Sequence, residues 1–185
     1  MFTQNYINYR RMCFFNQSAS FVVHDGGSYS CSTQYSYNGD IGNYLLSGRS
    51  GTPGTNSGSL SSLTPYSPGV YFGGGSTPAT LNDYCLESPI TSGLSVTNPT
   101  SPIEESGNGK YTLSASYLVG NTSESDINIW EIGFFGFVGR YKSSTYYKYD
   151  TLFERTVLTE PITIQPGESK IVTYKITFNQ TLNIE

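Results

Sequence analysis

A chain of 185 residues, of which 36% are hydrophobic, is long enough to bury the core of one domain. Its net charge of −4 gives no general attraction to nucleic acid, so we expect no nucleic-acid partner. The chain contains 20 glycines, 16 tyrosines and 10 phenylalanines, which favour strands, tight turns and aromatic packing over helices. We identify no amphipathic helix.

The first residues do not form a secretory signal. Arg10 and Arg11 are not followed by a continuous apolar run or by a small-residue cleavage site. No stretch reaches the ~18 apolar residues that span a bilayer, so we expect no membrane partner and synthesis in a cytoplasm. Cys13, Cys31 and Cys85 have no CxxC spacing and suit reduced thiols, although a Cys13–Cys31 bridge stays open.

Residues 1–18 are polar and rich in Asn and Tyr, and we predict an N-terminal arm. Because this arm has strand-forming aromatics but little core to cover, we expect it to pair with a neighbouring chain, with Tyr6 and Tyr9 in the contact. Residues 19–185 are predicted to form a single domain. It begins with a strand at 19–24, which ends at a turn of Asp25, Gly26 and Gly27.

Residues 26–66 are predicted to be a loop-rich insertion or extension of that domain. Between Gly26 and Asn82 the only charged residues are Asp40 and Arg49, and Ser, Gly, Thr, Asn and Tyr predominate. Such a segment has too little apolar content to pack as a core element.

The rest of the chain shows the period-two alternation of half-buried strands. A Pro-Gly pair at 166–167 predicts a hairpin-type turn between the last two strands. We therefore predict an all-β fold, an antiparallel β-sandwich of jelly-roll type with a long Gly/Ser/Tyr-rich N-terminal segment. The predicted strands are 69–72, 92–97, 110–119, 126–137, 151–158, 162–164 and 170–179.

Three stretches resemble a family of small virion structural proteins from tailed bacteriophages. They are YFGGGSTPATLNDYCLESPI (71–90), INIWEIGFFG (127–136) and LFERTVLTEPITIQPGESKIVTYKITF (152–178). Their order and spacing carry the resemblance, which covers about the C-terminal two thirds of the chain. The resemblance implies a non-enzymatic virion component that assembles with itself, as a homo-oligomer, and with other capsid or tail proteins.

Glu131 lies within an apolar predicted strand, where a charge is costly unless it is paired. Arg155, in the next predicted strand, is a plausible partner. We predict a structural Glu131–Arg155 ion pair, with a contact between subunits as the alternative. Either would be architecture rather than catalysis.

Catalytic and metal-binding patterns are weak. His24 with Cys13 could form a nucleophile and base, and Glu104–Glu105 or Glu124 with Asp126 could be paired carboxylates for glycoside cleavage. Each of these is better explained as a surface or loop residue. There is no phosphate-binding loop and no cluster of Cys and His, so we expect no enzyme, no cofactor and no metal site.

The tyrosines suggest a second function. Tyrosine combines a large rigid surface with a polar tip, so it suits protein interfaces and can stack on sugar rings. The runner-up hypothesis is therefore a receptor- or glycan-binding module on a phage head or tail fibre, with a host surface glycan as partner and with loops 26–66 and 139–150 as its surface. A bacterial surface or pilus subunit is a weaker alternative. The candidate contacts in these loops are Tyr35, Tyr37, Tyr44, Tyr141, Tyr146 and Tyr147.

Overall fold

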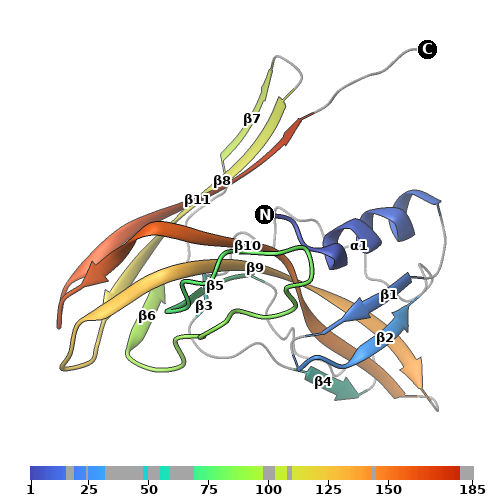
Figure 1. The fold of residues 1–185 in the computed structure, drawn as a ribbon, viewed down its shortest axis with the longest axis horizontal. Coiled ribbons are helices and arrows are strands. Elements are labelled where there is room, and N and C mark those ends of the chain that lie inside the picture. Colours follow the sequence, from blue (N-terminus) through green and yellow to red (C-terminus); the bar gives the residue numbers. More distant parts are fainter. Residues whose placement is uncertain are drawn as a thin grey trace.

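A computed structural model describes residues 1–15, 19–23, 25–31, 48–49, 55–58, 69–97, 103–107, 110–142 and 145–179. These residues form eleven strands and one helix (Figure 1). The elements are α1 (Gln4–Phe15), β1 (Ala19–Val22), β2 (Ser28–Cys31), β3 (Gly48–Arg49), β4 (Thr55–Gly58), β5 (Gly69–Gly73), β6 (Leu94–Thr97), β7 (Ile103–Gly107), β8 (Lys110–Asn121), β9 (Ile127–Lys142), β10 (Thr145–Ile164) and β11 (Ser169–Asn179). No helix in the described residues is long and apolar enough to cross a membrane.

The described strands form three sheets. The order of the five-stranded sheet is β3-β5-β9-β10-β4, and that of the second sheet is β11-β8-β6, with β7 also pairing with β8. β1 and β2 form a separate two-stranded sheet. All strand pairs are antiparallel except β3 with β5. The prediction of an all-β, antiparallel fold is therefore confirmed, with the addition of one short helix.

The long β9–β10 hairpin is the centre of the five-stranded sheet. Its register runs from Thr145 opposite Lys142 to Ile164 opposite Ile127, with irregularities at 152–154 and 157–162. The predicted loop at 139–150 was wrong, because most of it extends the two strands of this hairpin. The predicted strands 151–158 and 162–164 are one strand. Pro161, which cannot donate a backbone hydrogen bond, lies in its irregular part.

The Pro-Gly turn has the predicted local geometry but a different place in the fold. Gly167 has a φ of 75°, and the amide of Glu168 donates to the carbonyl of Gln165 at 2.9 Å. The strands on its two sides do not pair, since β10 pairs with β9 and β11 with β8. The turn is instead tied to the end of β8, where the amide of Asn121 donates to the carbonyl of Glu168 at 2.9 Å. It therefore leads the chain from one sheet into the other.

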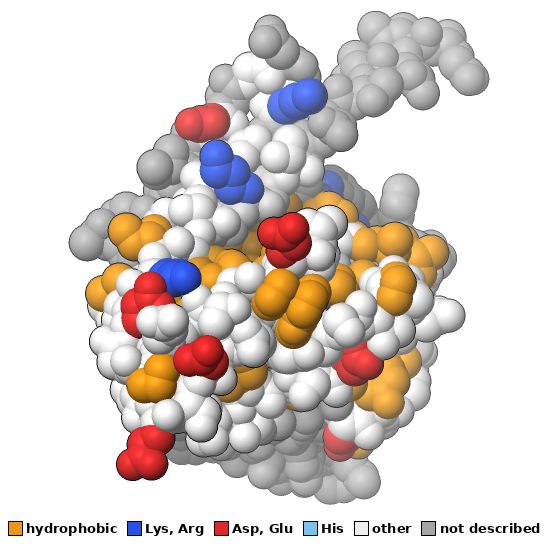
Figure 2. Space-filling model, turned by 60° about the vertical axis from the view of Figure 1, so that its left-hand side comes forward, with side chains coloured by type: hydrophobic (Ala, Val, Ile, Leu, Met, Phe, Trp, Pro, Cys, Tyr) orange, Lys and Arg blue, Asp and Glu red, His pale blue; other side chains and the backbone are white. Residues whose placement is uncertain are grey.

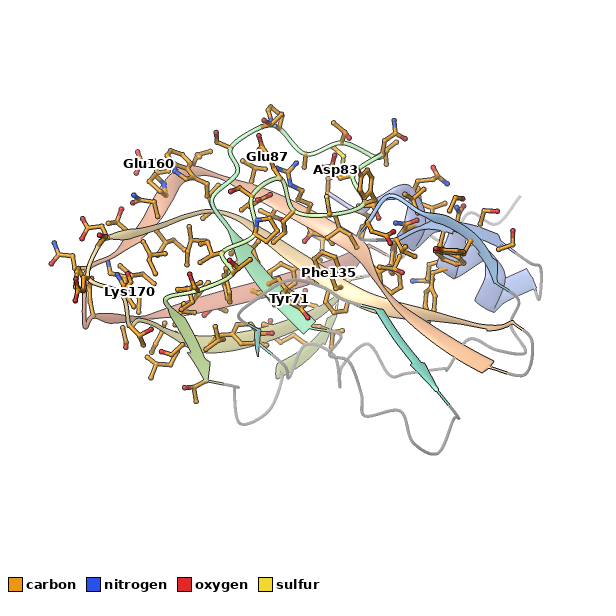
Figure 3. The ribbon with its side chains drawn as sticks, turned by 90° about the horizontal axis from the view of Figure 1, so that it is seen from below. Tyr71, Asp83, Glu87, Phe135, Glu160 and Lys170 are labelled. Carbon is orange, nitrogen blue, oxygen red and sulfur yellow. The ribbon has the colours of Figure 1, made fainter. Side chains whose placement is uncertain are left out.

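The main core lies between the two larger sheets. The rings of Phe72 on β5 and Tyr117 on β8 meet edge to face, with centroids 6.3 Å apart. The other face of the five-stranded sheet carries a smaller cluster of Tyr71, Phe135, Leu152 and Leu86. Leu86 comes from the segment 74–93, which joins β5 to β6 and passes over this face (Figure 3). The central sheet is therefore covered on both faces.

The N-terminal arm is a helix rather than a strand, which corrects the sequence analysis. At its start, the backbone carbonyl of Thr3 accepts hydrogen bonds from the amides of Tyr6 and Ile7 at 3.1 and 3.3 Å, and the Thr3 hydroxyl donates to the carbonyl of Leu152 in β10 at 2.7 Å. Tyr6 and Tyr9 are 7% and 8% exposed and belong to the main core. The side chain of Asn5 bonds both the amide and the carbonyl of Val22 in β1, at 2.9 and 2.7 Å. The helix is thus packed within its own chain.

Candidate functional site

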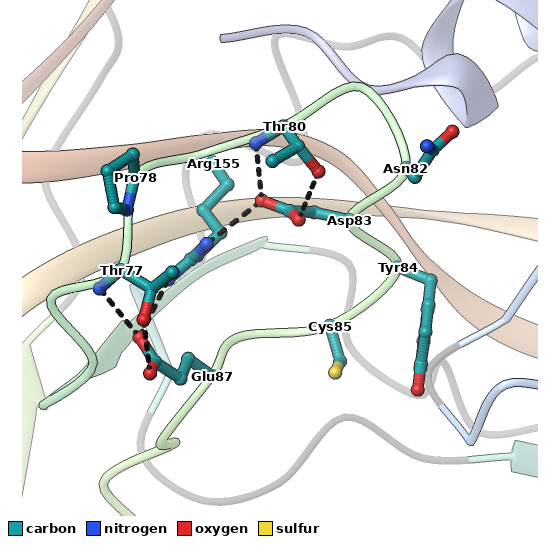
Figure 4. Close-up of a pocket in the computed structure, with 9 residues that line it drawn as sticks. All are labelled: Thr77, Pro78, Thr80, Asn82, Asp83, Tyr84, Cys85, Glu87 and Arg155. Carbon is teal, nitrogen blue, oxygen red and sulfur yellow. Dashed lines mark hydrogen bonds and ion pairs between the residues drawn. The ribbon is translucent and has the colours of Figure 1, made fainter.

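Arg155 is the centre of a polar network on the outer face of the five-stranded sheet, the face covered by segment 74–93. The residue is 3% exposed. Its Nε donates to Glu131 Oε2 at 2.7 Å, its Nη1 to Asp83 Oδ2 at 2.9 Å and its Nη2 to Glu87 Oε2 at 3.3 Å (Figure 4 shows the last two). We name these four residues the Arg155 brace. The structure thus brings together the two residues that the sequence pairs, and adds two more carboxylates.

Glu131 on β9 is fully buried, and backbone donors complete its hydrogen bonding. Its Oε1 accepts from the amides of Gly75 at 3.2 Å and Ser88 at 2.8 Å, and its Oε2 from the amide of Glu87 at 3.1 Å. A Cβ at Gly75 would lie 2.7 Å from Oε1, so only glycine lets the backbone come this close. Charge-assisted hydrogen bonds of this kind offset the cost of burying a carboxylate. The single side chain of Glu131 therefore holds both ends of segment 75–88 on the sheet.

The other two carboxylates are each fixed by a threonine. Asp83 accepts from the amide and hydroxyl of Thr80 at 2.9 and 2.7 Å, and Glu87 accepts from those of Thr77 at 2.8 and 2.6 Å. Burial raises the pKa of Asp83, but the hydrogen bonds from Thr80 and Arg155 outweigh it, and the net pKa lies below its usual value. The hydrogen bonds from Thr77 lower the pKa of Glu87. Both carboxylates are therefore poor proton acceptors.

Arg155 stays charged in this environment. Burial alone lowers the pKa of its guanidinium, but Asp83 and Glu131 outweigh that effect and raise the pKa above its usual value. All three of its nitrogens that can donate have a carboxylate partner. The positive charge of the guanidinium is thus balanced by the carboxylates of the brace.

A pocket of about 260 Å³ lies beside the brace (Figure 4). Its potential nucleophile is Cys85, whose thiol is free. Burial, and then the charge of Glu131, raises the pKa of this thiol, which keeps it protonated near neutral pH. Cys85 is therefore not an activated nucleophile. Its lining residues are Thr77, Pro78, Thr80, Asn82, Asp83, Tyr84, Cys85, Glu87 and Arg155.

A second pocket, of about 330 Å³, lies between α1, β1 and residues 81–84. Four residues with side-chain amides, Gln4, Asn5, Asn8 and Asn82, are among those that line it. Tyr84 lines both pockets and is 39% exposed. Amide groups can both donate to and accept from hydroxyl groups, and an exposed aromatic ring can cover the apolar face of a sugar.

The inner face of the same sheet holds a second buried carboxylate, Glu154. Its Oε1 accepts from the Met1 ammonium and from the hydroxyl of Thr156, both at 2.6 Å, and its Oε2 accepts a short hydrogen bond from Tyr174 on β11. Burial, and then the charge of Glu154, raises the pKa of Tyr174 well above its usual value. This contact links β10 to β11 across the main core.

The tyrosines and the histidine that were singled out in the sequence lie in different parts of the chain. Tyr6 and Tyr9 lie in the chain's own core, so the prediction that they form an interface or bind a glycan is corrected. Tyr141 and Tyr146 are directly opposite each other in the β9–β10 hairpin, and Tyr147 follows them. Tyr35, Tyr37, Tyr44 and His24 lie outside the described residues.

The carboxylate pairs considered for glycoside cleavage lie elsewhere. Glu104 and Glu105 belong to β7, which corrects their assignment to a loop. Glu124 and Asp126 are exposed between β8 and β9. None of the four belongs to the two pockets.

Asp83 and Glu87 were missed as partners of Arg155. They lie 72 and 68 residues before it, in a segment with no strand or helix periodicity. The sequence offered only a local indication. Thr80 lies three residues before Asp83, a spacing at which an Asp side chain can accept a hydrogen bond from a backbone amide of the same turn. That spacing indicates an ordered turn, but it does not show that the Asp83 carboxylate pairs with Arg155.

No protein-family model matches the chain, and neither a curated protein nor a solved structure matches it. A functional proposal therefore depends on the residues and their geometry.

Proposed function

We propose that the protein is a non-enzymatic structural component of a tailed-bacteriophage virion, made in the host cytoplasm and built into the particle. Its partners are copies of itself and other capsid or tail proteins. Its biochemical role is association, with no cofactor and no catalytic step. The Arg155 brace supports this proposal.

The brace unites the three stretches that carry the resemblance to phage virion proteins. Asp83 and Glu87 come from 71–90, Glu131 from 127–136 and Arg155 from 152–178. These stretches are distant in sequence, yet each supplies a charged group to one network. That convergence supports reading them as parts of a single scaffold rather than as unrelated turns and strands.

The arrangement of the sheets supports the finer fold proposal, an antiparallel β-sandwich of jelly-roll type. Strands from both larger sheets contribute to one core cluster, including Val70, Tyr117, Ile129 and Val172. The turn at 165–168 passes from one sheet to the other, as connections in such sandwiches do.

The direct test is the composition of purified particles of the phage that encodes the chain. Particles are banded by density, washed in high salt and analysed by quantitative mass spectrometry. We expect peptides of this chain at a constant ratio to the other structural proteins across independent preparations. Recovery of the chain only in the infected-cell lysate, with particles devoid of it, would contradict the proposal.

A second candidate function is glycan binding. The observation that favours it is the exposed ring of Tyr84 between two pockets whose lining residues include several amide, hydroxyl and carboxylate side chains. An uncharged sugar fits this chemistry better than an anionic one, because the cation in the lining, Arg155, is already held by three carboxylates.

Glycan binding is tested by titrating the purified chain with neutral monosaccharides (glucose, galactose, mannose and N-acetylglucosamine) and following its amide chemical shifts. We expect shifts near residues 81–84 that are lost in Tyr84→Ala and retained in Leu118→Ala, which changes an exposed residue outside both pockets. Tyr146→Ala with Tyr147→Ala tests the surface that the sequence predicted. No shift with any of the four sugars would contradict this candidate.

A further inference from the structure

β11 lies at the edge of its sheet. All eleven of its residues are in register with β8, from Ser169 opposite Gly120 to Asn179 opposite Lys110, without a bulge. In the part of the chain that the structure describes, β11 has no strand on its other side. A long, regular edge of this kind presents a row of backbone donors and acceptors to another strand.

Two hydrogen bonds show which backbone groups of β11 point outward. The amide of Asn121 donates to the carbonyl of Glu168, next to β11, and the amide of Thr122 donates to the carbonyl of Gly93, next to β6. The direction of the backbone N–H and C=O groups alternates from one residue to the next along a strand. In β8, these groups therefore point toward β11 at odd-numbered residues and toward β6 and β7 at even-numbered residues. With the observed register, the odd-numbered residues of β11 direct their N–H and C=O groups away from the sheet.

The side chains of the same residues are open to solvent. Ile171 is 74% exposed, and Thr173, Lys175 and Thr177 are also exposed, whereas Val172, Tyr174 and Ile176 between them are buried. Figure 2 shows hydrophobic side chains scattered among polar ones on the face that it views. Backbone pairing along the edge, rather than burial of one wide apolar patch, is the association that this pattern suits.

We propose that the edge of β11 pairs antiparallel with β11 of a second copy of the chain, on a two-fold axis at Tyr174. This is the register in which all eleven residues overlap. Outward-facing residues then exchange backbone hydrogen bonds, with Thr173 opposite Lys175 of the second copy and Ile171 opposite Thr177. On the buried face, Val172 lies opposite Ile176 of the second copy, so the apolar row continues through the axis.

Charge and the length of the overlap together favour this register of the two β11 strands. An axis at Lys175 would place two lysines directly opposite each other, which is unfavourable, and an axis at Thr173 would shorten the overlap. With the axis at Tyr174, each Lys175 faces a threonine. The strand is thus self-complementary, as a two-fold interface requires. This inference draws on the proposed function only for its place in the particle.

The test is sedimentation velocity of the full chain over roughly 1 to 100 µM, with two variants that place opposite charges at one position. Thr173→Lys puts a lysine opposite each Lys175, whereas Thr173→Glu puts a glutamate there. Both variants lose the same hydrogen bond between Thr173 and Ser116, of 2.8 Å, so this loss is common to both. Circular dichroism checks that both fold.

We expect a concentration-dependent dimer for the unaltered chain. Thr173→Lys should raise its dissociation constant roughly tenfold, since two opposed pairs change per dimer, and Thr173→Glu should leave it equal or lower it. Adding Lys175→Glu to Thr173→Lys should restore the dimer. A strict monomer throughout the series, or equal dissociation constants for the two variants, would overturn the inference.

The two proposals fail separately. A monomer in solution overturns the β11 pairing but leaves the presence of the chain in particles untouched. Absence of the chain from purified particles overturns the virion role and leaves a measured dimer in place.

Discussion

Adjacent residues of β10 hold their charges in different ways on the two faces of the sheet. Arg155, on the outer face, has three carboxylate partners, and two of them are also anchored by threonines. Glu154, on the inner face, is bound by an ammonium group and by the hydroxyls of Thr156 and Tyr174. The first network fastens a long connecting segment onto the sheet, and the second joins two sheets through the core.

The difference lies in what remains when one partner is lost. Removing Arg155 leaves three negative charges close together, one of them on the fully buried Glu131. Removing the charge of Glu154 leaves two neutral hydroxyls, which can still bind the amide oxygen of a glutamine, and the ammonium of Met1, a residue that is more than half exposed. A cation shared by several carboxylates is therefore the more sensitive point of the fold.

The largest effect is expected for Arg155→Met. This change leaves Glu131 buried without a cation, and we expect the free energy of unfolding to fall by about 3–5 kcal/mol. Urea denaturation measures it. Glu168→Gln is the control, because it removes an ion pair of 3.6 Å whose side chains are 42% and 39% exposed, and it should cost less than about 1 kcal/mol. Equal effects of the two changes would show that the brace does not stabilise the fold.

The next effect concerns the helix that covers the inner side of β10. The ring of Tyr9 is 8% exposed, with its centroid 5.0 Å from that of Phe153. Tyr9→Ala should lower the free energy of unfolding by about 3 kcal/mol, because it opens a cavity in the core. Ile7→Ala changes a residue of the same helix that is 39% exposed, and should cost less than about 1 kcal/mol. If Tyr9→Ala were as mild as Ile7→Ala, the helix would not belong to this core.

A smaller effect is expected at Glu154. Glu154→Gln keeps the shape of the side chain but weakens its hydrogen bonds to Tyr174 and Thr156, which should cost about 1–3 kcal/mol. The same change removes the charge that helps to raise the pKa of Tyr174, so that pKa should fall. Absorbance at alkaline pH follows tyrosine ionisation. A titration curve identical to that of the unaltered chain would contradict this assignment.

The smallest effect is expected for Asp83→Asn, at about 1 kcal/mol near neutral pH. The pKa of Asp83 is lower in the folded chain than in the unfolded chain, so its ionised form adds stability above the unfolded pKa of about 3.9. That stability is lost as the pH falls through the folded pKa. Thermal unfolding between about pH 5 and pH 3 should therefore show a shallower loss of stability in the variant. An unchanged slope would contradict the predicted shift.

Strand positions were predictable where alternation was regular. β5, β6, β8, β9 and β11 lie where the sequence places strands, and Gly167 has the positive φ that a Pro-Gly turn requires. The partner of β11 was not predictable, because alternation gives the face of a strand but not its neighbour. A turn of this type therefore does not by itself establish a hairpin.

The helix α1 was missed because its aromatic residues favour strands by composition and its asparagines are weak helix formers. The helix is stabilised by contacts of Tyr6 and Tyr9 with Phe153 in the sheet. These residues are distant in sequence, so no local sequence pattern predicts the contacts.

Half of the Arg155 brace followed from the sequence. A charge at Glu131 within an apolar strand required a partner, and Arg155 was the nearest cation in the next strand. Asp83 and Glu87 could not be assigned in this way, because a connecting segment has no periodicity from which to infer which face of the sheet it covers.

The most direct test of the account is hydrogen exchange at the amides of Gly75, Glu87 and Ser88, which all donate to Glu131. If the brace holds segment 75–88 on the sheet, these three amides exchange slowly in the unaltered chain. In Glu131→Gln they should then exchange faster together, while the amides of β8 and β11 keep their rates. Exchange of the three amides at the rate of an unstructured peptide in the unaltered chain would contradict the account.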